Sequence, residues 1–123
     1  MSKKILIIED EKTLADSLGE KLTQEGFDVL RAEDGITGLD MAFQNEPDLI
    51  LLDIVMPKMN GLEMLSRLRK DDWGKLVPVI LLTNYENTTK MEEVKQYGVE
   101  DYLIKSGTKL QDIVDKVRSV IKL

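Results

Sequence analysis

The chain has 123 residues, with 17 basic and 23 acidic side chains and a formal net charge of −6 at neutral pH. This length suits one domain with one sizeable core, and the negative charge argues against binding to nucleic acid or to an anionic membrane. The sequence contains neither cysteine nor histidine, which excludes disulfides, thiolate metal sites and Ser-His-Asp chemistry and leaves carboxylates, hydroxyls and amines as the reactive groups.

The first predicted element is a strand at residues 5–8, a short run of isoleucine and leucine that follows two lysines. Such a continuous apolar run predicts a strand that is covered on both faces. It is too short for a signal-peptide core or a membrane span, so we expect a soluble, cytoplasmic protein. Residues 11–25 then carry apolar side chains at helical spacing, and Gly26 follows where that helix would end.

The succession of strand and helix continues along the chain. Strands are predicted at residues 27–30, 49–52, 77–82 and 102–104, and helices at 35–44, 62–70 and 89–97. A final helix shows one apolar stripe, formed by Leu110, Ile113, Val114, Val117, Val120 and Ile121. Strict alternation predicts an α/β fold, in which a parallel sheet is joined by right-handed crossovers and has helices on both faces. Ligands of such sheets bind outside the carboxyl ends of the strands.

Polar side chains follow four of the five predicted strands. Taken singly, an acid at a strand end is often a helix cap. That interpretation suits Glu11 best and Asp53 least, because the helix after Asp53 begins several residues later. Parallel strands would nevertheless bring all of these side chains to one edge of the sheet. They are Glu9, Asp10 and Glu11 after the first strand, Asp53 after the third, Thr83 and Asn84 after the fourth, and Lys105 and Ser106 after the fifth.

Clustered carboxylates repel one another unless a cation is present. Mg²⁺ prefers oxygen ligands and suits a site with two carboxylates and bound water. Asp53 could then act as a nucleophile toward phosphorus, while the metal and Lys105 neutralise the phosphoryl oxygens and Thr83 donates a hydrogen bond. After Asp53, proline and glycine in "MPKMNG" predict a turn, in which Gly61 would tolerate a positive φ.

These residues stand in motifs that resemble the receiver domain of two-component response regulators. The motifs are "ILIIEDE", "PDLILLDIVMPKMNGLEML", "VPVILLTN" and "VEDYLIKS", and they span essentially the whole chain in the expected order. The resemblance implies one receiver domain over residues 1–123. It also implies a flavodoxin-like, doubly wound, five-stranded parallel sheet with strand order 2-1-3-4-5.

The resemblance further assigns roles to individual residues. Asp53 would be the phosphoacceptor, and Mg²⁺ would be held by Glu9, Asp10, Asp53 and the backbone carbonyl of Val55. The remaining roles implied are the switch hydroxyl for Thr83, the phosphate-pairing lysine for Lys105 and the aromatic switch residue for Tyr102.

The function expected from the resemblance is a phosphorylation-dependent signalling switch. A sensor histidine kinase or a phosphotransfer protein would supply the phosphoryl group, since this chain has no histidine. The domain would catalyse only its own phosphorylation and dephosphorylation. Its signal would pass through Thr83 and Tyr102 to a face made by the fourth helix, the fifth strand and the last helix. The target would be another protein or an output domain that these residues do not include, with no role for nucleic acid or membrane.

Three positions depart from the family pattern. Ser106 stands where a proline with a cis peptide bond is usual, and we expect a trans bond here because a cis bond before serine costs roughly 2.5 to 4 kcal/mol. Asn84 replaces a small residue and could narrow the approach to Asp53. Asn60 replaces an aspartate, a near-isosteric change.

Other functions are open to the same sequence. A receiver-like interaction module that is not phosphorylated would keep the fold, although the chain retains every charged member of the site. A hydrolase with an aspartyl-phosphate intermediate is less favoured, because such enzymes carry a second acid where this chain has Val55. A flavodoxin-type cofactor binder is disfavoured because "EDEKT" supplies acids where a phosphate would need N–H groups and hydroxyls.

Overall fold

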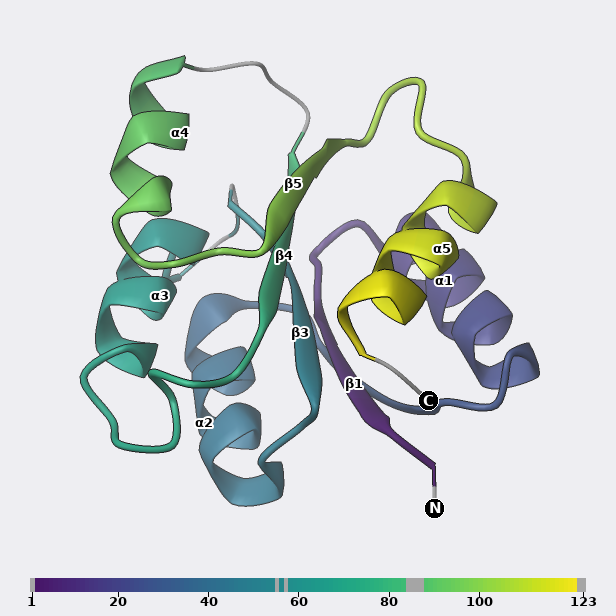
Figure 1. Cartoon of the computed structure of the whole chain (residues 1–123), viewed down its shortest axis with the longest axis horizontal. Coiled ribbons are helices and arrows are strands. Elements are labelled where there is room, and N and C mark those ends of the chain that lie inside the picture. Colours follow the sequence, from purple (N-terminus) through teal and green to yellow (C-terminus); the bar gives the residue numbers. More distant parts are fainter. Residues whose placement is uncertain (1, 55, 57, 84–87, 122–123) are drawn as a thin grey trace.

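The computed structural model describes residues 2–54, 56, 58–83 and 88–121. Strands and helices alternate along this part of the chain, as the hydrophobic pattern predicts (Figure 1). The strands are β1 (Lys4–Ile8), β2 (Asp28–Ala32), β3 (Leu49–Asp53), β4 (Val79–Thr83) and β5 (Asp101–Ile104). The helices are α1 (Lys12–Gln24), α2 (Gly35–Asn45), α3 (Gly61–Leu68), α4 (Thr88–Lys95) and α5 (Leu110–Val120).

The strands form one parallel sheet in the order β2-β1-β3-β4-β5. Both the α/β class and the predicted strand order are therefore confirmed. β1 and β3 are neighbours at the centre, where Ile8 is paired with Leu52. Because all strands run in one direction, their carboxyl ends meet at a single edge, where the polar residues of the sequence pattern are expected.

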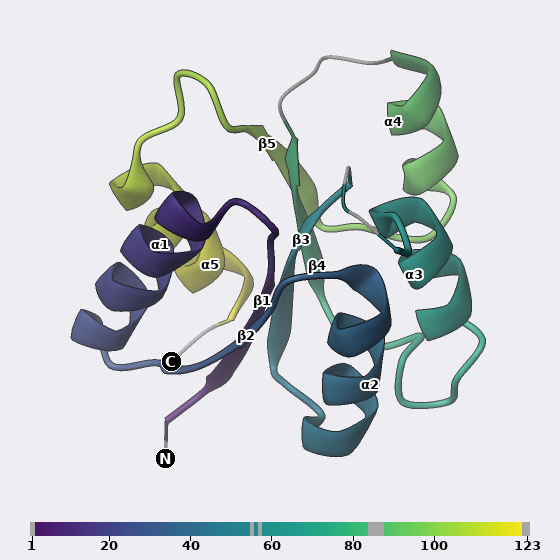
Figure 2. The same cartoon turned by 180° about the vertical axis from the view of Figure 1, so that it is seen from behind.

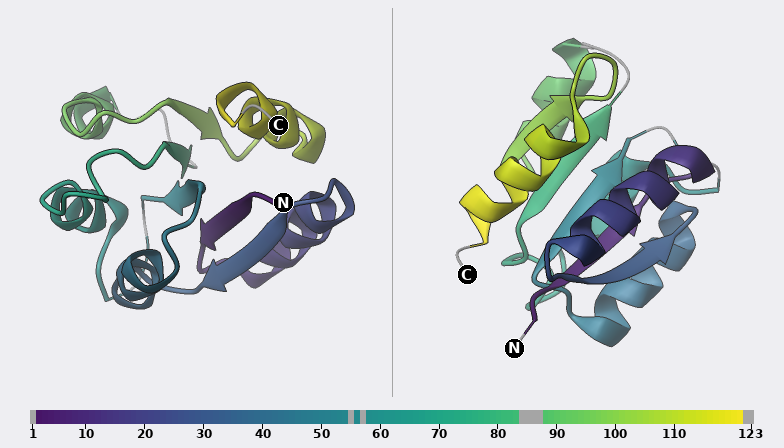
Figure 3. Two further views of the ribbon diagram at one scale, coloured as in Figure 1. Left: turned by 60° about the horizontal axis from the view of Figure 1, so that its bottom comes forward. Right: turned by 90° about the vertical axis from the view of Figure 1, so that its right-hand side faces the viewer.

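The helices cover both faces of the sheet. α1 and α5 lie on one face, and α2, α3 and α4 lie on the other (Figures 1 and 2). In the left view of Figure 3 the strands lie between these two helix layers. Successive residues of a strand point to opposite faces, so the apolar runs of the sequence build two cores. Ile5 and Ile7 pack beneath α1 and α5, whereas Leu6 and Ile8 pack beneath the other three helices.

Element boundaries differ from the prediction by at most two residues. Residues 27–30 were expected as a strand, but the ladder runs from Asp28 to Ala32, and Phe27 is a buried residue that precedes it. Val77 is likewise buried without being part of β4. Apolar side chains fill the core beyond the ends of the ladder, so a hydrophobic run does not define where strand pairing begins. Helix α1 ends as predicted, because Gly26 with φ 98° follows its last turn.

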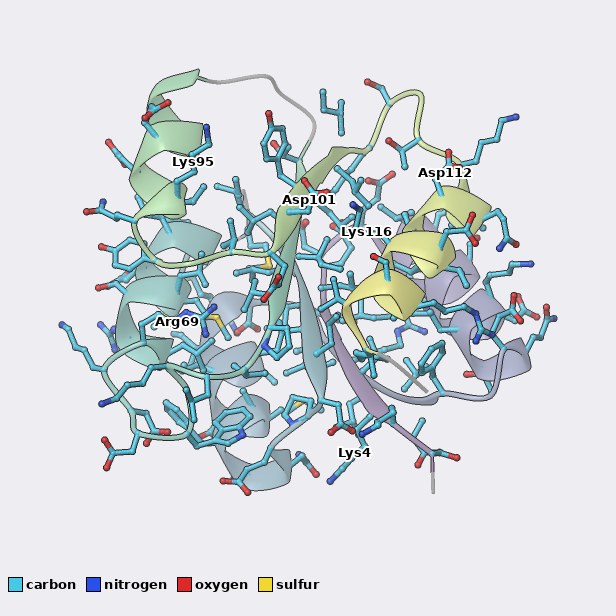
Figure 4. All side chains as sticks on the ribbon, viewed as in Figure 1. Lys4, Arg69, Lys95, Asp101, Asp112 and Lys116 are labelled. Atoms are coloured by element: carbon cyan, nitrogen blue, oxygen red, sulfur yellow. The ribbon has the colours of Figure 1, made fainter. Side chains whose placement is uncertain are left out.

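At the amino ends of the strands, Arg69 connects the end of α3 to the segment that precedes β4 and to the connection between α4 and β5. Its guanidinium group donates to the carbonyl of Tyr97 at 2.7 Å, to those of Gly74 and Val77 at 2.7 Å, and to that of Gly98 at 3.3 Å. Figure 4 shows Arg69 at the end of α3, beside the connections that lead into β4 and β5. The side chain therefore ties the connection after α4 to the end of α3.

In the described part of the chain, no helix is long and apolar enough to cross a membrane.

We predict that Arg69→Met lowers the free energy of unfolding by about 2 kcal/mol, since it removes charged donors from several backbone carbonyls. Arg67→Met is the matched control. Arg67 lies two residues earlier, its side chain is 55% exposed, and its ion-pair partner among the described residues is Glu63 at 3.1 Å, so its loss should cost about 0.5 kcal/mol or less. Urea unfolding of the three proteins measures both values. Equal losses in the two variants would contradict the role assigned to Arg69.

Candidate functional site

Two carboxylates, a hydroxyl and an ammonium group come to the carboxyl edge of the sheet. Glu9 follows β1 directly, Asp53 is the last residue of β3, Thr83 is the last residue of β4, and Lys105 follows β5. Glu9, Asp53 and Thr83 are buried, with exposed fractions of 1%, 4% and 4%. Regular strand pairing holds the edge in place: the Glu9 N–H donates to the Ala32 carbonyl at 3.0 Å and the Lys105 N–H to the Thr83 carbonyl at 2.7 Å.

The Lys105 ammonium group lies at the centre of the cluster. Its Nζ is 2.5 Å from Oε1 of Glu9, 3.0 Å from Oδ2 of Asp53 and 3.8 Å from Oε2 of Glu11. The side chains of Glu9, Asp53 and Lys105 are 0%, 6% and 8% exposed. Buried charges of this kind are tolerated only when they are paired, so Lys105 is what allows two carboxylates to lie inside the protein.

The pKa of Glu9 shows that Lys105 compensates the charge of the two carboxylates only in part. Burial raises the pKa of the Glu9 carboxyl from 4.5 to about 7, and the charge of Asp53 adds to the effect, although contacts with Lys105 and with the Glu11 N–H act in the opposite direction. Burial by itself would lower the pKa of Lys105, but its hydrogen bonds to Glu9 and Asp53 raise it. The lysine is therefore firmly protonated, while Glu9 gains from a further positive charge.

The acids also form a possible cation site. One carboxylate oxygen from each of Glu9, Asp10 and Asp53 lies within 4.8 Å of the others, and Asp10 is exposed to solvent. These hard oxygen donors, with one side open to water, fit Mg²⁺. The backbone carbonyl predicted as a further ligand belongs to Val55, which lies outside the described residues.

The backbone after Asp53 corrects one prediction. Gly61 does not adopt a positive φ; it is the first residue of α3, and Asn60 caps that helix by accepting from the Glu63 N–H at 2.9 Å. Glycine is needed there for space, because a methyl group on Gly61 would lie 2.6 Å from the Asp53 carbonyl oxygen. Among the described residues of this connection, Lys58 has a positive φ, of 66°.

The other predicted positions have distinct environments. Glu11 occupies the N-cap position of α1, as expected, but its side chain makes no capping hydrogen bond. Tyr102 is 39% exposed on β5. No cis peptide bond occurs in the described part of the chain, so the predicted trans bond between Lys105 and Ser106 is confirmed. Asn84 lies outside the described residues.

An ion pair marks the surface beside Tyr102. Asp101 of β5 and Lys116 of α5 are 2.6 Å apart, and Figure 4 shows the two side chains next to each other. Burial raises the pKa of Asp101, but hydrogen bonds from Lys116 and from the Tyr102 N–H outweigh it and lower the pKa below its usual value. The pair fixes β5 against α5, and because successive strand residues point to opposite faces, the Tyr102 side chain points to the other face of the sheet.

Sequence reasoning placed the start of α2 correctly at residue 35 but missed the residue that caps this helix. Asp34 is 8% exposed and caps this helix by accepting from the Thr37 N–H at 2.8 Å, and its Oδ2 lies 3.6 Å from Nζ of Lys58. An aspartate directly before a predicted helix is a recognisable capping signal. The contact with Lys58 could not be found in this way, because it joins two separate connections.

Comparisons with known proteins agree with this geometry. Residues 5–118 match the family model of the response regulator receiver domain. The DNA-binding dual master transcriptional regulator RpaA of Synechocystis sp. is 34% identical over 119 residues, which cover 97% of this chain and 49% of RpaA. The chain thus spans about half the length of the curated relatives it matches.

Solved structures share the fold along nearly the whole chain. Chemotaxis protein CheY4 of Vibrio cholerae superposes with a TM-score of 0.91 at 26% identity, covering 98% of this chain and 100% of CheY4. The receiver domain of sensor histidine kinase PA1611 from Pseudomonas aeruginosa has a TM-score of 0.83 at 27% identity, covering 97% of both chains. In that neighbour a magnesium ion is coordinated in the active-site cleft.

We predict that Glu9→Gln stabilises the metal-free protein at pH 8, because a neutral amide replaces a carboxylate that burial makes costly to ionise. Since the folded pKa is raised, the favourable contribution of Glu9 is complete below pH 4.5 and is lost as the pH rises through about 7. The variant should therefore gain several degrees in unfolding midpoint at pH 8, where about 1 kcal/mol shifts it by about 4 °C, and much less at pH 5.

Glu20→Gln is the control for this prediction. Glu20 lies exposed on α1, so its neutralisation should leave the midpoint nearly unchanged at both pH values. Thermal unfolding followed by circular dichroism, with a chelator present, gives the comparison. A Glu9→Gln protein that is less stable than wild type at pH 8 would show that the carboxylate is a net stabilising group.

Proposed function

Because this chain belongs to the response regulator receiver domain family, we propose that Asp53 accepts a phosphoryl group and so switches the protein between two signalling states. The observation that carries this proposal is the ammonium group of Lys105, held 3.0 Å from the buried Asp53 carboxylate within an otherwise acidic cluster. Asp53 attacks phosphorus, an acyl phosphate forms, and the leaving group of the donor departs.

Glu9, Asp10 and Asp53 would hold Mg²⁺ together with the backbone carbonyl of Val55. The support is the hard oxygen donor set and the raised pKa of Glu9, which favours a second cation. When bound, Mg²⁺ supplies positive charge to the phosphoryl oxygens. Lys105 supplies positive charge from the protein side. Its ion pair with Asp53 would be replaced by one with a phosphoryl oxygen once the carboxylate has reacted.

Thr83 and Tyr102 would convert the new charge into a change of surface. Thr83 ends β4 next to Asp53, because Asp53 is paired with Leu82 in the sheet. Its hydroxyl can donate to a phosphoryl oxygen, and that movement would leave space into which the exposed ring of Tyr102 can turn. The readout surface would then be the face of α4, β5 and α5.

The partners follow from the same chemistry. Receivers of this family take their phosphoryl group from histidine kinases, and we infer a sensor histidine kinase or a phosphotransfer protein as the donor. RpaA is named as a DNA-binding regulator, which supports an output domain or a separate protein as the target. We further infer that residues 1–123 form one cytoplasmic receiver domain, which promotes only its own phosphorylation and dephosphorylation.

We predict that incubation with Mg²⁺ and acetyl phosphate adds one phosphoryl group, which mass spectrometry locates on Asp53. Omission of Mg²⁺ or the substitution Asp53→Asn should abolish the adduct. Asp40→Asn is the control, since Asp40 is exposed on α2 and should not affect labelling. A folded wild-type protein that stays unmodified with both acetyl phosphate and a phosphohistidine donor would favour the non-phosphorylated interaction module. Continuous turnover of the donor by a catalytic amount of protein would favour the hydrolase.

A second prediction concerns the relay. Beryllofluoride, a mimic of the phosphoryl group, should draw Thr83 toward Asp53 and reduce the 39% exposure of Tyr102. Crystal structures with and without the mimic measure both changes. In Thr83→Ala, beryllofluoride should still bind but Tyr102 should stay exposed. Unchanged Thr83 and Tyr102 rotamers in the bound wild type would contradict the relay.

A further inference from the structure

The N-terminal end of α2 packs directly on the connection between β3 and α3. A methyl group on Gly35, the first residue of α2, would lie 2.2 Å from the carbonyl oxygen of Met59 and 2.9 Å from its carbonyl carbon. Met59 itself is 5% exposed. The helix and the connection thus meet backbone to backbone, and no side chain can yield between them.

A second contact of the same kind follows two residues later. A methyl group on Gly61 would lie 2.6 Å from the Asp53 carbonyl oxygen and 2.8 Å from the Cα of Ile54. The Gly61 N–H also donates to the Ile54 carbonyl at 2.8 Å. The segment from Met59 to Gly61 therefore fills the space between the start of α2 and the end of β3.

Asp34 and Lys58 hold this segment from its outer side. Lys58 adopts φ 66°, a conformation that non-glycine residues keep only where the surroundings enforce it. Its Nζ lies 3.6 Å from Oδ2 of Asp34. Asp34 is itself fixed, because it also accepts hydrogen bonds from the N–H and the hydroxyl of Thr37, at 2.8 and 3.2 Å.

We propose that the N-terminal end of α2, formed by Asp34 and Gly35, is a positioning element that sets the placement of Asp53 for phosphoryl transfer. Gly35 acts through the Met59 backbone and Gly61, and Asp34 acts through Lys58. Neither residue touches the reacting atoms. This inference rests on the proposed function of Asp53 as phosphoacceptor and goes beyond it, because it names what fixes the acceptor backbone.

The physical reason lies in the demands of in-line transfer. The attacking carboxylate must stay aligned with phosphorus while Lys105 and the other acids remain where they are, and a shift of about 1 Å can cost a factor of about 100 in rate. On its β4 side Asp53 is supported by strand pairing with Leu82. Beyond its own carbonyl the chain leaves the sheet, and the contacts with Gly61 and, through Met59, with Gly35 take over that support.

The test compares Gly35→Ala with Gly74→Ala in the whole chain. A methyl group on Gly74 would lie 2.1 Å from the Leu68 carbonyl oxygen, in the connection between α3 and β4. Both substitutions therefore press a methyl group against a backbone carbonyl, but only the first does so in the segment that leads to Asp53. Circular dichroism gives the unfolding midpoint, and mass spectrometry gives the rate of Asp53 phosphorylation over a range of acetyl phosphate concentrations.

For Gly35→Ala we expect the rate at saturating acetyl phosphate to fall about 10-fold or more, while the half-saturating concentration changes little. For Gly74→Ala the saturating rate should stay within about twofold of wild type despite a lower midpoint, since distant sites act independently. A general effect of destabilisation would lower the rate in both variants alike. That result, or a wild-type rate in folded Gly35→Ala, would overturn the proposal.

If Gly35→Ala does not fold, Lys58→Gly tests the positioning role of the N-terminal end of α2. Glycine accepts a positive φ without strain, so this variant should keep or raise the unfolding midpoint while it loses the contact with Asp34. We expect its saturating rate to fall severalfold, and an unchanged rate would overturn the proposal. Absence of any adduct on wild-type Asp53 would instead be a failure of the proposed function, which the wild-type measurement reveals first.

Discussion

The site is organised by one buried ammonium group that is shared between carboxylates from two different strands. Lys105 reaches Glu9 and Asp53 from the end of β5, across β4. Removing the ammonium group would leave the two buried carboxylates uncompensated inside the protein, which is among the costliest defects a core can carry. Such an arrangement requires strands that cannot drift. The order β2-β1-β3-β4-β5 meets this requirement, because Glu9 and Asp53 come from adjacent central strands with fully buried apolar runs.

The same cluster is short of positive charge. One lysine stands among Glu9, Asp10, Glu11 and Asp53, and the pKa of Glu9 is raised to about 7 in spite of it. Lys105 thus allows the carboxylates to be buried, but it does not balance their negative charge. Binding of a divalent cation, or of a group that is accompanied by one, stabilises such an acidic site, whereas a fully neutralised cluster would have no preference for a cation. The electrostatic deficit is therefore a property that suits a switch.

Much of the architecture could be predicted from sequence because it depends on local patterns. Apolar β-branched runs and helical spacing gave the order of elements, and the carboxyl ends of parallel strands gave Glu9, Asp53 and Lys105 as neighbours. What could not be predicted depends on distances across the fold. Arg69 binds carbonyls 28 and 29 residues away, and no periodicity reveals such contacts. Gly61 was assigned to a turn with positive φ, whereas its role is to let the Asp53 backbone approach.

The two edges of the sheet have different mechanical roles. At the carboxyl edge, the proposed reaction of Asp53 would change the charge. At the amino edge, Arg69 fixes the connection that follows α4. Among the α4 side chains that the structure describes, those of residues 92–95, Val94 is the buried one. Thr83 precedes α4 in the chain, whereas Arg69 holds the connection that follows it. A charge that acts on Thr83 and the hold that Arg69 provides therefore act at opposite ends of this helix.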